Sequence, residues 1–132
     1  MEGEPTAPAH PPATILVVDD DESVRAVLVG LLRNAGFEVL AAASGEQALA
    51  RLQAGAPAID LVVLDMNMPG MDGAATFRAI AARHPGTKVM LMSGAAGDAE
   101  VRPLLQAGAL CFLPKPQGLR GLVGRVRAAL CR

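Results

Sequence analysis

Aromatic residues are scarce in this 132-residue sequence, which has three Phe and neither Trp nor Tyr. A surface that stacks nucleic-acid bases on aromatic rings is therefore not expected. The formal net charge is only -1, so no overall field favours direct contact with nucleic acid or an anionic membrane. No apolar run is long enough to cross a bilayer. We therefore expect no membrane partner and a cytoplasmic location.

The two cysteines, Cys111 and Cys131, are too few for a disulfide framework, so free thiols in a reducing compartment are expected. The first twelve residues, MEGEPTAPAHPP, lack both apolar periodicity and the apolar core of a secretory signal. We predict a flexible proline-rich leader or linker remnant at residues 1–12 and a single domain at residues 13–132.

From residue 13 onward, short apolar runs alternate with segments of helical periodicity. The strands are apolar on both faces, which is typical of a parallel sheet covered by helices on both sides. Right-handed crossovers then predict a doubly wound α/β domain. The pattern predicts strands at 14–19, 37–42, 59–65, 88–93 and 110–113, and helices at 21–36, 44–54, 72–83, 98–107 and 119–130.

Polar side chains collect where the predicted strands end, the edge at which such sheets bind ligands. Clustered carboxylates repel one another, so a cation is expected among them. Mg²⁺ fits because it prefers oxygen ligands and keeps several waters. In chain order the polar residues are Asp19, Asp20, Asp21, Asp65, Asn67, Ser93 and Lys115.

Asp65 is the candidate nucleophile, because a carboxylate can form an aspartyl-phosphate. The Lys115 ammonium, the Ser93 hydroxyl and Mg²⁺ would stabilise a phosphoryl group whose charge is spread over three oxygens. In the loop MNMPGMDG, the backbone carbonyl of Asn67 can turn back toward the metal. We expect Pro69, Gly70 and Gly73 to build a tight loop, because Gly permits the positive φ that such loops need.

The segments ILVVDDD, LVVLDMNMPGMDG, LMSG and CFLPKP, in this order, resemble the receiver domain of two-component response regulators. The resemblance covers residues 14 to about 130. It implies a flavodoxin-like, five-stranded parallel sheet in the order 2-1-3-4-5. It also implies that Asp65 accepts phosphate from a sensor histidine kinase or a histidine phosphotransfer protein.

The same resemblance implies that Asp20, Asp65 and the backbone carbonyl of Asn67 bind Mg²⁺ directly, while Asp19 assists. Asp21 lies outside the motif and is expected to cap the helix that follows it.

Three further positions would carry the signal away from the site. The resemblance implies that Ser93 follows the phosphoryl group, Lys115 contacts it, and Phe112 is the aromatic switch. A downstream protein target would bind the surface formed by the helix 98–107, the strand 110–113 and the helix 119–130. The sequence departs from the family at Gln117, where Phe is common, and Phe112 has no hydroxyl for a partner bond.

Two other functions fit parts of the pattern. A small aspartate-nucleophile phosphohydrolase also ends a strand on an aspartate, but usually has a second aspartate where this sequence has Asn67. A degenerate receiver would act only as a protein-interaction module, and the intact acids, Ser93 and Lys115 argue against it. A functional receiver catalyses only its own phosphorylation and dephosphorylation, so no other enzymatic activity is expected. A stand-alone regulator and a receiver from a larger protein both fit the sequence.

Overall fold

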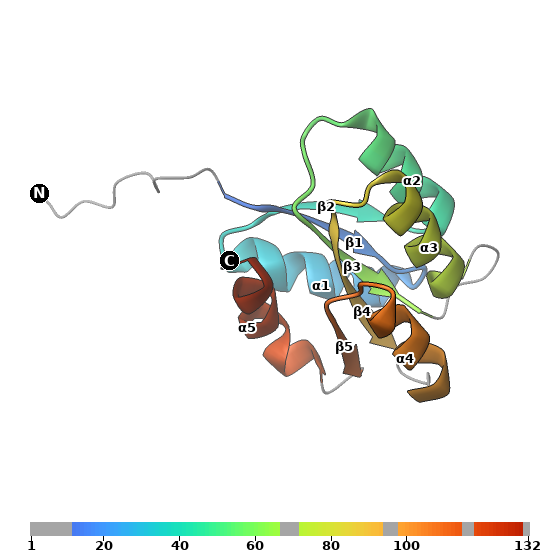
Figure 1. The fold of residues 1–132 in the computed structure, drawn as a ribbon. Coiled ribbons are helices and arrows are strands. Elements are labelled where there is room, and N and C mark those ends of the chain that lie inside the picture. Colours follow the sequence, from blue (N-terminus) through green and yellow to red (C-terminus); the bar gives the residue numbers. More distant parts are fainter. Residues whose placement is uncertain (1–11, 67–71, 94–97, 115–117, 131–132) are drawn as a thin grey trace, which may run out of the picture.

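The computed structural model describes residues 12–66, 72–93, 98–114 and 118–130, in which strands and helices alternate along the chain (Figure 1). The five strands are β1 (Thr14–Val18), β2 (Glu38–Ala42), β3 (Leu61–Asp65), β4 (Lys88–Ser93) and β5 (Cys111–Pro114). The five helices are α1 (Glu22–Asn34), α2 (Gly45–Ala54), α3 (Gly73–Arg83), α4 (Asp98–Gln106) and α5 (Gly118–Leu130). Each lies at its predicted place, and the bounds differ by a few residues at most.

The strands form one parallel sheet in the order β2-β1-β3-β4-β5. The predicted fold class and strand order are therefore confirmed. β1 and β3 are neighbours in the middle of the sheet, and the strand order reverses beside β1. In doubly wound sheets this switch point is where ligands bind, outside the carboxyl ends of the strands.

Helices cover both faces of the sheet, α1 and α5 on one side and α2, α3 and α4 on the other (Figure 1). Alternate residues of each strand point to opposite faces, so Ile15 and Val17 pack toward α1 and α5. Leu16 and Val18 pack toward the other three helices. Burial on both faces accounts for the continuous apolar runs in the sequence.

Short polar residues fix where the first two helices begin. The Asp21 side chain accepts a hydrogen bond from the Val24 N–H at 3.0 Å and caps α1, as predicted. Ser44 caps α2 by accepting from the Gln47 N–H at 3.1 Å. The Gln47 side chain reaches back to the N–H of Ala43 at 2.8 Å, which completes a variant of the capping box. These caps satisfy backbone N–H groups in the first turn of each helix, which have no partner inside the helix.

Two general features of the chain follow from the described residues. None of the helices described is long and apolar enough to cross a membrane. Cys111 is a free, half-buried thiol, while Cys131 lies outside the residues that the structure describes.

Candidate functional site

Two aspartates end up side by side because their strands pair in parallel register. Val18 of β1 lies opposite Leu64 of β3, and the next residue on each strand is an aspartate, Asp19 or Asp65. All five residues of β1 and all five of β3 are buried. Asp65 is the last residue of β3, and Asp19 directly follows β1, so each aspartate stands at the end of a buried strand. Asp19 is only 1% exposed and Asp65 only 3%.

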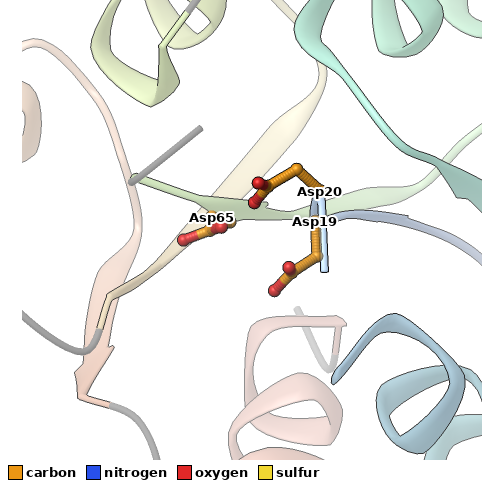
Figure 2. A group of neighbouring side chains, drawn as sticks. All are labelled: Asp19, Asp20 and Asp65. Carbon is orange, nitrogen blue, oxygen red and sulfur yellow. The ribbon is translucent and has the colours of Figure 1, made fainter. Parts of the chain in front are cut away.

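Asp20 completes an acidic group with these two residues at the carboxyl ends of β1 and β3 (Figure 2). One oxygen from each carboxylate can be chosen so that all three lie within 4.8 Å of one another. Asp20 is exposed, in contrast to Asp19 and Asp65. At this separation two carboxylates repel by about 3.5 kcal/mol if the effective dielectric constant is about 20. Three negative charges gathered here therefore favour a cation.

Hydrogen bonds from the start of α1 hold Asp19 in place. The Asp21 N–H donates to Asp19 Oδ1 at 2.9 Å, which orients the carboxylate. Arg25 Nη1 donates to the backbone carbonyl of Asp19 at 2.8 Å, so a positive charge lies beside the acidic group. The sequence reasoning missed Arg25. Its signal was a cation one turn into the helix that directly follows the acids.

Beyond Asp65, the chain returns to the site through Gly73. The Gly73 N–H donates to the Met66 carbonyl at 3.2 Å. A Cβ at Gly73 would lie 2.4 Å from Met66 Cα and 2.6 Å from the Asp65 carbonyl oxygen. Gly73 does not use the positive φ that glycine permits in such loops, since the positive-φ glycines of the described chain are Gly36, Gly55 and Gly108. Glycine is needed at position 73 because the start of α3 packs directly on the backbone of Asp65.

The remaining predicted residues are only partly described. Ser93 is the last residue of β4, and Met92 before it pairs with Asp65, so Ser93 lies at the same edge of the sheet. Phe112 of β5 lies opposite Leu91 of β4. Its half-buried side chain packs against the core under α2, α3 and α4. Asn67 and Lys115 lie outside the described residues, as do Pro69 and Gly70.

The donor set of the acidic group fits Mg²⁺. All three residues offer carboxylate oxygens, the hard ligands that Mg²⁺ prefers. Two of them are buried and fixed, while the third is open to solvent. An ion held on that side could therefore keep several of its waters, as Mg²⁺ usually does.

Comparison with known proteins gives the same picture. Residues 15–127 match the family model of the response regulator receiver domain. The chain is 39% identical over 118 residues to the sensor kinase CckA of Brucella abortus, covering 89% of this chain and 12% of that protein. It is 40% identical over 118 residues to the transcriptional regulatory protein CpxR of Escherichia coli, covering 89% of this chain and 49% of the relative. The chain thus spans less than half of each relative.

A solved structure also superimposes closely. The receiver domain protein from Methanospirillum hungatei, described as CheY-like, aligns with a TM-score of 0.83 and 28% identity. The alignment covers 90% of this chain and 94% of that one. The family match does not favour the phosphohydrolase alternative. The acidic group, the strand order and the match over residues 15–127 together show that the chain belongs to the response regulator receiver domain family of two-component systems.

Proposed function

We propose that Asp65 accepts a phosphoryl group from a phosphohistidine in a Mg²⁺-dependent reaction. The observation that carries the proposal is the gathering of Asp19, Asp20 and Asp65 within 4.8 Å at the end of two neighbouring strands. The donor would be a sensor histidine kinase or a histidine phosphotransfer protein. Similarity to the sensor kinase CckA and the regulator CpxR supports a place in such a pathway.

In the proposed step, a carboxylate oxygen of Asp65 attacks the phosphorus of the phosphohistidine. The P–N bond breaks as the new P–O bond forms, and its electron pair returns to the imidazole, which takes a proton from water. Asp65 is suited to this role because its backbone is fixed on both sides. Pairing with Met92 holds the strand, and Gly73 packs on its carbonyl. Hydrolysis of the acyl phosphate would regenerate the carboxylate.

The direct metal ligands in this proposal are Asp20, Asp65 and the backbone carbonyl of Asn67, while Asp19 acts mainly through water. When bound, Mg²⁺ supplies positive charge that offsets the charge of the transferring phosphoryl group. Asp19 keeps its orientation through the Asp21 N–H, and Arg25 holds its carbonyl. Lys115 would supply a second positive charge, and Ser93 a hydroxyl donor.

The signal would then pass along β4 and β5 to the surface of α4, β5 and α5. Ser93 ends β4, and Phe112 lies on the neighbouring strand, where it is only half-buried. Burying a fully exposed Phe side chain is worth about 1.5–3 kcal/mol, so completing the burial of this half-buried ring would contribute part of that and bias two states of the domain. Leu105 on α4 and Leu110 before β5 are 38% and 45% exposed, so this surface offers apolar contacts to a protein target.

We assign residues 13–132 to the receiver and residues 1–12 to a leader or linker. The only reactions proposed for the chain are its own phosphorylation and dephosphorylation. The domain would act in the cytoplasm. It would not contact nucleic acid directly, because its proposed partners are proteins.

Acetyl phosphate labelling tests this function without a kinase. We expect intact mass to increase by one phosphoryl group when Mg²⁺ is present, and chelation to prevent the increase. Asp65→Asn should abolish labelling, whereas the matched variant Asp21→Asn should be labelled like wild type because Asn is an equally good helix cap. Equal labelling of Asp65→Asn, or labelling that resists a chelator, would refute the proposal.

A further inference from the structure

A cavity that is open to solvent lies at the opposite edge of the sheet from the acidic group. It has a volume of about 400 Å³ and is lined by Lys88, Leu110, Cys111, Arg125, Ala128 and Ala129. Lys88 and Cys111 are the first residues of β4 and β5, and the two alanines belong to the last turns of α5. Met92, which pairs with Asp65, is four residues further along β4 than Lys88. That separation is roughly 13 Å, so the two sites do not overlap.

The walls of this cavity are mostly apolar. Cys111 and Ala129 pack at the margin of the core on the α1 and α5 side. Leu110 is 45% exposed at the mouth, and Ala128 is exposed on α5. Small-molecule sites typically have volumes of about 300–1,000 Å³, apolar walls and a few polar groups. The cavity falls at the small end of this range.

Two cations provide the polar groups, and none of the six lining residues is acidic. Lys88 Nζ donates to the Ala129 carbonyl at 2.8 Å, which fixes the ammonium at the end of α5. An ammonium has three N–H donors, so two remain for another acceptor. Arg125 is exposed and has no hydrogen-bond or ion-pair partner within the described part of the chain. An oxyanion that reached both side chains would satisfy both.

We propose that this cavity binds a small carboxylate with a short apolar body. The carboxylate would accept hydrogen bonds from Lys88 and from the guanidinium of Arg125, a geometry that suits planar carboxylates. The apolar body would pack on Leu110, Cys111 and Ala128. A single carboxylate suffices for the two cations, because Lys88 already donates one hydrogen bond to the Ala129 carbonyl. The apolar walls of the cavity disfavour an ion that is polar on all sides. The carboxylate would bind with Asp65 unphosphorylated.

Hexanoate is a suitable probe, with acetate and hexanamide as matched controls for the apolar body and the charge. In a titration followed by amide NMR shifts, hexanoate should give saturable shifts at Lys88, Leu110, Cys111 and Ala128. Acetate and hexanamide should each bind at least about tenfold more weakly, because each lacks one of the two recognised features.

Substitutions at the lining residues Arg125 and Leu110 test whether hexanoate binds in this cavity. Arg125→Gln and Leu110→Ser should each weaken hexanoate binding by about fivefold or more, while Arg102→Gln, at an exposed position of α4 outside the cavity, should not. An unchanged amide spectrum away from each substitution shows that the variant is folded. Non-saturable shifts, shifts centred elsewhere, or equal affinity for acetate would overturn the proposal. So would about tenfold tighter binding of N-acetyl-Leu-Glu, which would assign the cavity to a protein segment.

Discussion

Removing one charge from the acidic group should stabilise the protein when no metal is bound, and Asp20→Asn is the cleanest substitution. The Asp20 side chain is exposed and has no hydrogen-bond partner within the described chain, so Asn removes charge without breaking a bond. Its carboxylate lies within 4.8 Å of those of Asp19 and Asp65. Each repulsion is worth about 0.9 kcal/mol in water, and screening by salt reduces the sum to about 1 kcal/mol.

The order of stability should reverse when Mg²⁺ is added. At a Mg²⁺ concentration of ten times its Kd, the wild type gains about 1.4 kcal/mol by mass action. The variant lacks one proposed ligand and should gain much less. Thermal unfolding followed by circular dichroism measures both effects. In chelator we expect the Tm of Asp20→Asn to be about 4 °C above wild type, and in Mg²⁺ to be at or below it.

Asp21→Asn is the matched control, because Asp21 is the next residue and lies outside the acidic group. It should change stability by less than about 0.5 kcal/mol, through a weaker interaction with the α1 dipole, and should keep the full response to Mg²⁺. The advantage of Asp20→Asn in chelator should also decrease as ionic strength rises. A variant that is less stable than wild type in chelator, or that gains as much from Mg²⁺, would refute the reasoning.

Four other substitutions, one of them a control, test separate parts of the structure. Gly73→Ala should lower the free energy of unfolding by about 3 kcal/mol in urea titrations, because its Cβ would collide with the backbone of Met66 and Asp65; Gly30→Ala, whose Cβ meets nothing within 4 Å, should instead stabilise by up to about 1 kcal/mol. Ser44→Ala should cost about 1 kcal/mol in the same titration through loss of the α2 cap, and no change would show that the cap is dispensable. Phe112→Ala should leave Asp65 phosphorylation intact but suppress the NMR shifts that an acyl-phosphate analogue induces in α4 and α5; equal shifts in both proteins would exclude the ring as the relay.

The fold could be predicted because its signals are local and repeated. Strands such as Leu61–Asp65 are apolar at every position before the final acid, which is typical of a sheet covered on both faces. Asp21 and Ser44 mark helix starts through the hydrogen-bonding of their own side chains. Once the strands are parallel, Asp19 and Asp65 have to meet at one edge. The roles of Asp19 and Asp65 are implied by the resemblance and remain a proposal.

Contacts between distant segments could not be predicted in the same way. The reason for glycine at position 73 depends on how closely α3 approaches β3, and the sequence shows only a residue compatible with many turns. The bond from Arg25 to the Asp19 carbonyl depends on the path of the chain between β1 and α1, which the sequence does not show. The cavity beside Lys88 depends on how the end of α5 sits over β4 and β5.

The most direct test of the central claim is to map the phosphorylated residue chemically. Borohydride reduces an aspartyl-phosphate to homoserine, which peptide mass mapping then locates. After reaction with acetyl phosphate and Mg²⁺, we predict homoserine at position 65 and at no other aspartate, and none when a chelator is present. Homoserine at position 19 or 20, or formation at position 65 without Mg²⁺, would contradict the account of the site.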